Sequence, residues 1–219
     1  LRSFLEEHAE VKEDKCYNKK TGKRIVACVP MHTFGFPCSI NEIAKICASW
    51  HITLVEDAAE SLGSYYGKQH TGTFGELGVF SFNGNKIVTA GGGGCLVTNN
   101  ETLAKRIKHL STTAKVPHRW EYVHDEIGFN YRLPNLNAAL ICAQLEQLPT
   151  FLNLKRNLAN AYKDFFDQTD IKFKWEMPGT TANYWLNTVE LADRNQRDEF
   201  LNITNEHGVM TRPVWDLMS

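Results

Sequence analysis

Residues 52–64 read I-T-L-V-E-D-A-A-E-S-L-G-S, and residues 78–98 read G-V-F-S-F-N-G-N-K-I-V-T-A-G-G-G-G-C-L-V-T. Each stretch contains a short apolar run, rich in β-branched and aromatic residues, of the kind that forms a buried strand. The carboxylate of Asp57 closes the first run, and the amine of Lys86 follows the second. We expect the chain to fold around these strands, with both groups at their ends.

The residues before the first stretch predict a βαβ unit. Residues 25–29 form a β-branched run closed by Pro30, and residues 52–55 form the next strand. Between them, Ser39 is expected to cap a helix, with Glu42 completing a capping box. Strands joined by a helix through short links run parallel and are covered by helices. We therefore expect an α/β fold with a mostly parallel sheet and helices on both faces.

The next part of the chain surrounds Lys86 and then loses regular structure. Strands are expected at residues 79–82 and 95–98, followed by a helix at residues 101–110. Residues 111–130 show no clean period and are rich in aromatic residues and His. This pattern indicates a long functional or interfacial loop.

The C-terminal third predicts a smaller second domain. Residues 136–166 have helical spacing broken at Pro149, so two consecutive helices are expected. The pattern that follows predicts a strand at 171–175, a strand at 184–191, a helix at 194–207 and a strand at 209–212. We therefore assign residues 1–150 to a large domain and residues 151–219 to part of a smaller α/β domain.

Asp57 and Lys86 together suit a pyridoxal 5′-phosphate site. Ligands bind at the carboxyl ends of parallel strands, where Asp57 is expected. A carboxylate beside the protonated ring nitrogen lets the ring act as an electron sink, and a lysine amine forms the Schiff base. Alone, Asp57 fits a helix N-cap equally well, and Lys86 fits a surface lysine. The glycines around Lys86, at residues 84 and 91–94, favour the cofactor because they let the backbone approach a ligand closely.

Three motifs resemble one known family. Residues 55–61 read V-E-D-A-A-E-S, residues 81–86 read S-F-N-G-N-K, and residues 128–133 read G-F-N-Y-R-L. Together they resemble the nucleotide-sugar aminotransferases of the DegT/DnrJ/EryC1/StrS family, which have the fold type I architecture and use pyridoxal 5′-phosphate. The resemblance implies transfer of an amino group, with glutamate as the expected donor, to a nucleotide-linked keto-sugar used for surface polysaccharide or glycan.

The resemblance also implies roles for residues near the two strands. Lys86 would be the Schiff-base lysine and proton carrier, and Asp57 would pair with the ring nitrogen. Ser81 would bind the cofactor phosphate; otherwise it is a strand serine satisfied by the backbone. Glu60 matches a family position, often Gln or His, near the ring hydroxyl.

Three residues outside these strands are further candidates. Asn130, with Arg132, matches a family segment that reaches the cofactor phosphate of the neighbouring subunit, so a homodimer with a shared site is expected. Otherwise Asn130 is a turn residue. Arg212 matches a position where the family begins to hold the sugar nucleotide, and the planar fork of Arg suits a diphosphate. His32 follows a strand, but a lone His is more often structural.

Two other functions stay open. The runner-up is a sugar dehydratase of the same family, in which His replaces the lysine, so Lys86 favours transamination. A non-catalytic piece is the other alternative. The chain starts at Leu1 rather than Met, and the resemblance implies that the helix N-terminus holding most of the phosphate, the aromatic residue stacking on the ring and the end of the small domain are missing.

Composition excludes several other classes. With 24 basic and 25 acidic residues the net charge is -1, which gives no reason to expect a nucleic-acid partner. The six cysteines form no C-x-x-C pair, so neither a metal site nor a disulfide framework is expected. The apolar runs are too short for a membrane span, and no secretory signal opens the chain. A cytoplasmic protein is therefore expected.

Overall fold

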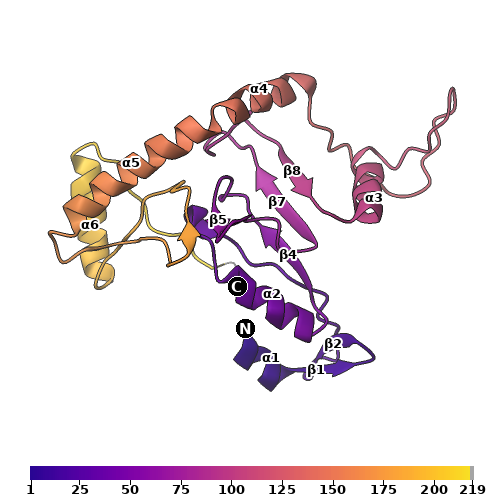
Figure 1. Ribbon diagram of the computed structural model, residues 1–219, viewed down its shortest axis with the longest axis horizontal. Helices are drawn as coiled ribbons and strands as arrows, with labels where there is room; N and C mark the ends of the chain where they lie inside the picture. The colour runs from indigo at the N-terminus through magenta and orange to yellow at the C-terminus, as the bar shows by residue number, and fades with distance from the viewer. Residues whose placement is uncertain (218–219) are drawn as a thin grey trace. The chain divides into compact units, whose positions relative to one another are not determined.

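The computed structural model describes residues 1–217 and divides the chain into two compact units (Figure 1). The first unit comprises Leu1–Arg156 and Glu176–Leu186, and the second comprises Asn157–Trp175 and the residues from Asn187 onward. The predicted assignment of residues 1–150 and 151–219 to separate domains stays a prediction. The division into units shows in addition that a short segment late in the chain, Glu176–Leu186, packs with the first unit.

The centre of the first unit is a sheet of strands β3 (Ala27–Cys28), β4 (Thr53–Asp57), β7 (Leu77–Ser81) and β8 (Gly94–Val97), in that order. Figure 1 labels β4, β7 and β8 of this sheet. The pairs β3–β4 and β4–β7 are parallel, and β7–β8 is antiparallel. The α/β fold with a mostly parallel sheet is therefore confirmed. The antiparallel pair arises because β7 and β8 are joined directly by the loop that carries Lys86, without a crossover helix.

Helix α2 (Ile40–Ser49) links β3 to β4, as predicted. It buries Ile40, Ile46 and Cys47 in a core that also contains Leu54 of β4. Ser39 is the N-cap residue, but its side chain makes no capping hydrogen bond, so the predicted capping box is wrong. The reason lies in the backbone: Ser39 has ψ of 56° instead of the extended value that directs an N-cap side chain toward the helix.

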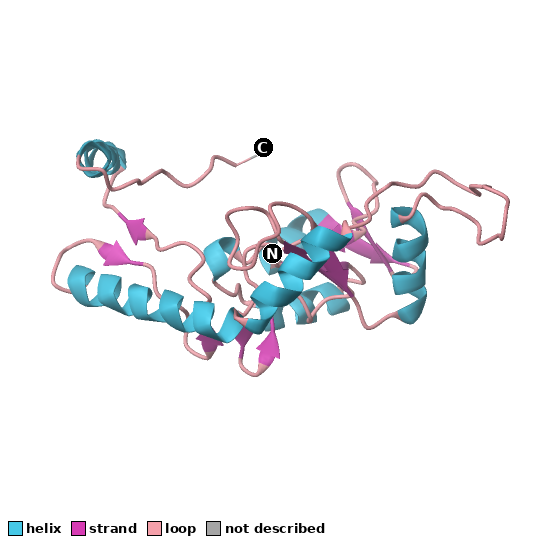
Figure 2. Ribbon diagram, turned by 90° about the horizontal axis from the view of Figure 1, so that it is seen from above, coloured by secondary structure: helices cyan, strands magenta, loops and turns pink. Residues whose placement is uncertain are grey.

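Three helices follow the sheet. Helix α3 (Glu101–Ser111) is capped by Asn100, whose side chain accepts a hydrogen bond from the Leu103 backbone. Helices α4 (Asn135–Glu146) and α5 (Leu148–Phe166) are consecutive, as predicted. The break falls at Gln147, because Pro149 is tolerated in the first turn of a helix. Residues 112–134 form a long irregular loop between α3 and α4 (Figures 1 and 2).

Smaller elements complete the first unit. They are α1 (Arg2–His8), the hairpin β1 (Ala9–Lys12) and β2 (Lys15–Asn18), the short 3-10 helix η1 (Thr33–Gly35), and the antiparallel sheet β10 (Thr180–Thr181), β5 (Tyr65–Tyr66) and β6 (Gln69–His70). The pairing of β10 with β5 is one of the contacts that tie Glu176–Leu186 to the first unit.

The second unit contains most of α5, the antiparallel pair β9 (Lys172–Phe173) and β11 (Val189–Glu190), and α6 (Arg194–Glu206). The strand predicted at residues 184–191 is therefore limited to its last part, because Tyr184 has a φ of +50° that ends extended structure. The strand predicted at residues 209–212 is wrong. There the Thr211 backbone carbonyl accepts a hydrogen bond from the Asn205 side chain of α6 instead of from a strand.

The helices of the described part of the chain, residues 1–217, include none whose length and apolar character would let it span a membrane.

Candidate active site

The structure brings Asp57 and Lys86 to the same edge of the sheet. Asp57 is the last residue of β4 and pairs in register with Val79 of β7. Lys86 lies in the turn that follows β7, where its backbone N–H donates to the Asn83 carbonyl. The Asp57 carboxylate is near enough for its charge to act on the Lys86 amine. The helix N-cap alternative for Asp57 does not apply, because residues 58–60 form a turn; its Oδ1 accepts a hydrogen bond from the Ala59 N–H.

Lys86 is held in a partly dehydrated place. Its side chain is 14% exposed, and its Nζ lies 3.8 Å from Glu60 Oε1 and 4.0 Å from the centre of the Trp185 indole ring. Burial lowers the pKa of Lys86, while the negative charges of Glu60 and Asp57 act against that shift. The surface-lysine alternative therefore does not fit this side chain.

A small hollow opens beside Lys86. Ser81, at the end of β7, and Glu60 contribute to its wall, so three of the predicted site residues meet there. Its lining residues are Ala59, Glu60, Leu62, Ser81, Lys86, Ile87, Val88, Asn183 and Trp185. The Ser81 hydroxyl accepts a hydrogen bond from the Asn83 backbone at 3.3 Å. An amine, a carboxylate and a hydroxyl thus share one small cavity.

Glu60 is fixed by the backbone on its far side. The Phe34 N–H donates to Glu60 Oε2 at 2.6 Å. The other carboxylate oxygen, Oε1, is the one that lies toward Lys86. Glu60 can therefore act on Lys86 while its own position is set by η1.

Glu56, the residue before Asp57, is a buried structural carboxylate that the sequence analysis did not single out. Successive residues of a strand point to opposite faces, so Glu56 and Asp57 point to opposite sides of the sheet. Glu56 Oε2 lies 3.0 Å from His32 Nε2, and both side chains are fully buried. The Cys38 N–H donates to His32 Nδ1, so the ring proton is on Nε2 and donates to Glu56. His32 is therefore structural, as its isolation in the sequence suggested.

The backbone completes the shell of Glu56. Its carboxylate also accepts hydrogen bonds from the N–H groups of Gly72, Phe74 and Gly75. Burial acts to raise the pKa of Glu56, but the hydrogen bonds from His32 and these N–H groups outweigh burial and lower it. The group fixes the loop before β7 to β4.

The second feature that sequence reasoning missed is the late segment at Asn183 and Trp185. Asn183 Nδ2 donates to the backbone carbonyls of Glu60 and Leu62, each at 2.9 Å. The Trp185 indole N–H donates to the Asn85 carbonyl at 2.6 Å. No local pattern signals these contacts, since about 100 residues separate Trp185 from Asn85.

Asn130 is not among the residues around the hollow, and Arg212 belongs to the second unit. Asn130 is exposed in the loop after α3, where it forms an isolated bridge with Thr112. Arg212 is exposed in the second unit, with its guanidinium 5.0 Å from the centre of the Trp215 ring. Neither lines the hollow, and their predicted roles stay predictions.

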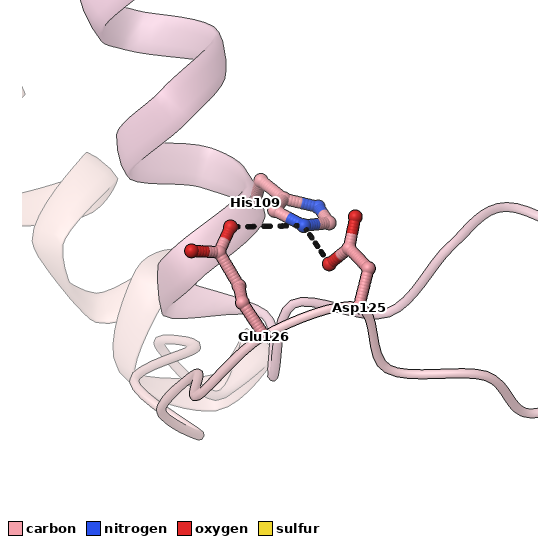
Figure 3. A group of neighbouring side chains, drawn as sticks. All are labelled: His109, Asp125 and Glu126. Atoms are coloured by element: carbon pink, nitrogen blue, oxygen red, sulfur yellow. Dashed lines mark hydrogen bonds and ion pairs between the residues drawn. The ribbon is translucent and has the colours of Figure 1, made fainter.

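A separate polar group lies on α3 and the loop after it (Figure 3). His109 Nε2 lies 2.7 Å from Asp125 Oδ1 and 3.5 Å from Glu126 Oε1. The Arg106 guanidinium pairs with both oxygens of Glu126. A metal ion would have to displace this guanidinium, so we read the group as an ion-pair network that holds the loop to α3.

Comparison with known proteins places the chain in a family. Residues 8–219 match the DegT/DnrJ/EryC1/StrS aminotransferase family. The chain is 36% identical over 203 residues to the GDP-perosamine synthase of Escherichia coli O157:H7, covering 93% of this chain and 54% of that protein. It is also 36% identical over 198 residues to the putative pyridoxal phosphate-dependent aminotransferase EpsN of Bacillus subtilis (strain 168), covering 90% and 51%.

A solved structure is similar as well. The aminotransferase TlmJ from Streptoalloteichus hindustanus has 29% sequence identity and a TM-score of 0.81, over 87% of this chain and 52% of that one. The chain spans about half the length of the curated relatives it matches.

Proposed function

We propose that this chain, which belongs to the DegT/DnrJ/EryC1/StrS aminotransferase family, provides the lysine-bearing part of a pyridoxal 5′-phosphate-dependent sugar aminotransferase. The observation that carries the proposal is the meeting of Lys86, Glu60 and Ser81 in one hollow, with the Asp57 charge acting on Lys86. The enzyme would move an amino group from an amino acid, glutamate being the expected donor, to a nucleotide-linked keto-sugar in the cytoplasm.

The residues present fit the cofactor. The partly buried amine of Lys86 has a pKa lowered by burial, which favours the neutral form that bonds to an aldehyde. Asp57 supplies the negative charge suited to a protonated ring nitrogen, and Ser81 supplies a hydroxyl for the phosphate. When bound, the cofactor supplies the electron sink for breaking the bond to the substrate α-hydrogen. Lys86, freed by the incoming amine, would carry that proton.

A homodimer with a shared site is part of the proposal. The loop of residues 112–134 and the start of α4 expose several large apolar side chains: Trp120, Tyr122, Ile127, Phe129, Tyr131 and Leu136. A group of large apolar side chains exposed on one loop favours an interface between subunits. Asn130 lies among these residues and would reach the cofactor phosphate of a second copy. Arg212 would hold the sugar nucleotide.

The cofactor assignment is tested by covalent trapping. The protein is incubated with pyridoxal 5′-phosphate, reduced with borohydride, digested and analysed by mass spectrometry. We expect one dominant pyridoxyl adduct, on the peptide that contains Lys86. The adduct should disappear in Lys86→Ala and persist in the matched control Lys108→Ala, because Lys108 is an exposed residue of α3. An adduct pattern unchanged in Lys86→Ala would overturn the assignment.

The substrate assignment is tested on protein that has given the pyridoxyl adduct on Lys86. A panel of nucleotide-linked keto-sugars is offered with nitrogen-labelled glutamate, and label in the sugar is measured by mass spectrometry. Label transfer that needs Lys86 would support the aminotransferase. Loss of a sugar hydroxyl without label uptake would contradict it and favour a dehydratase.

A further inference from the structure

The ammonium of Lys86 has two close partners inside the first unit, and the charge of the Asp57 carboxylate also acts on it. One is the Glu60 carboxylate, with Oε1 at 3.8 Å from Lys86 Nζ, and the other is the indole face of Trp185, with the ring centre at 4.0 Å. A carboxylate and an indole face both attract a cation, and both attractions strengthen where water is partly excluded. Glu60 and Trp185 line the same hollow as Lys86.

Trp185 is held in place independently of Lys86. Its backbone N–H donates to Asn183 Oδ1 at 2.8 Å, and its indole N–H donates to the Asn85 carbonyl at 2.6 Å. Its own carbonyl accepts a hydrogen bond from Lys155 Nζ at 3.0 Å. Trp185 is buried, with 4% of the residue exposed, and these bonds fix the orientation of the ring. A prepositioned ring costs little ordering entropy when a cation lies against it.

Asn183 ties this residue to the same backbone that carries Glu60. Its side-chain amide donates to the Glu60 carbonyl, while the Phe34 N–H fixes the Glu60 carboxylate. The packing at Asn183 is tight: a Cβ added to Gly35 would meet Asn183 Oδ1 at 1.8 Å. The two partners of Lys86 therefore belong to one rigid local structure.

We propose that Glu60 and Trp185 form a holding site for the amine of Lys86 once that amine has taken up a proton and is not bonded to the cofactor. This inference rests on the proposed function, in which substrate displaces Lys86 and leaves a free amine in a partly buried place. Without partners, a buried ammonium would lose its proton or move toward solvent. The holding site keeps both the charge and the proton beside the hollow, and Trp185 acts as a positioning residue.

The test measures the titration of Lys86 directly and needs no cofactor. The protein is labelled briefly with trinitrobenzenesulfonate across an alkaline pH series, and labelling of Lys86 is quantified by peptide mass spectrometry. Only the neutral amine reacts, so the midpoint of the profile reports the pKa of Lys86. Labelling of the exposed Lys108 in the same digest is the internal control.

Substitutions at the two partners should move that midpoint downward. Trp185→Leu keeps an apolar wall and removes the π face, so Lys86 labelling below the midpoint should rise roughly two- to thirtyfold. Trp185→Phe keeps an aromatic face and should lie between Trp185→Leu and the parent protein. Glu60→Gln, which is nearly isosteric, should also lower the midpoint. A purely structural role of Trp185 would change stability without this ordered shift.

The result that overturns the holding site is an unchanged or raised Lys86 midpoint in Glu60→Gln or in a folded Trp185→Leu, with folding checked by circular dichroism. Should Trp185→Leu fail to fold, Glu60→Gln and Trp185→Phe decide the question. The outcome is separable from that of the proposed function. A shifted midpoint without borohydride trapping of the cofactor would support the holding site and count against the enzyme assignment.

Discussion

Two histidine–carboxylate groups in the first unit differ in burial and therefore in what they do. His32 and Glu56 are both fully buried, and backbone N–H groups satisfy the remaining carboxylate positions. His109 and Asp125 are 26% and 53% exposed, and water can replace either partner. The same residue types thus form two different structures. One is a buried group that fixes the loop before β7 to β4, and the other is an exposed group that holds the loop 112–134 to α3. The free-energy cost of breaking each histidine–carboxylate pair depends on its burial more than on the distance between the partners.

The largest effect is expected at Glu56. Glu56→Ala would leave His32 and three backbone N–H groups buried without an acceptor, at a cost of about 3–5 kcal/mol of unfolding free energy. Urea unfolding followed by circular dichroism measures this. Asp125→Ala is the matched variant and should leave the midpoint nearly unchanged. Equal midpoint shifts in the two variants would contradict the comparison.

The pH dependence of stability sharpens the same contrast. The pKa of Glu56 is lowered in the folded protein from its ordinary value of 4.5, so its contribution to stability is present above that value. The contribution is lost as the pH falls through the lower folded-state value. In Glu56→Gln this part of the acid-induced loss should be absent, and urea midpoints measured from neutral to acidic pH should fall less steeply than in the parent protein. Parallel curves would count against a charged, buried Glu56.

A smaller, local effect is expected at the exposed group. His109→Ala removes a partner of Asp125 and should loosen residues 112–134 from α3 without a measurable change in the global unfolding midpoint. Limited proteolysis should cut this loop faster in the variant, and added salt should reduce the difference because it screens exposed ion pairs. Unchanged cleavage rates would show that other contacts hold the loop.

The smallest effect on folding is expected at Ile127, an exposed apolar residue of the loop 112–134. Ile127 is 85% exposed, so Ile127→Ser should leave the unfolding midpoint unchanged. If the surface is the proposed dimer interface, the same change should weaken self-association in analytical ultracentrifugation. A monomer–dimer equilibrium that is insensitive to this variant would remove the surface from the proposed interface.

Much of this structure could be predicted from local sequence patterns. The strand–helix–strand unit, helices α3 to α6 and the strands on either side of Lys86 follow from apolar periodicity and from turn residues, because each depends on neighbours within a few positions. The edge location of Asp57 follows from the end of its strand. The capping box at Ser39 was wrong, and the strand predicted at 184–191 was too long, because the backbone dihedral angles of Ser39 and Tyr184 do not fit those patterns. The strand predicted at 209–212 was wrong, because the Thr211 carbonyl accepts a hydrogen bond from the Asn205 side chain instead.

The sequence by itself therefore determined the α/β fold class and the location of a strand-end carboxylate and a loop lysine at the same edge of the sheet. Only the tertiary structure decided that Glu56 is a buried support and that Asn183 and Trp185 contact the segments around Glu60 and Lys86. The physical reason is that burial and hydrogen-bond partners are properties of the assembled chain. The segments that bury a side chain or bind it by hydrogen bonds can lie a hundred residues away in the sequence, so no local pattern predicts these contacts.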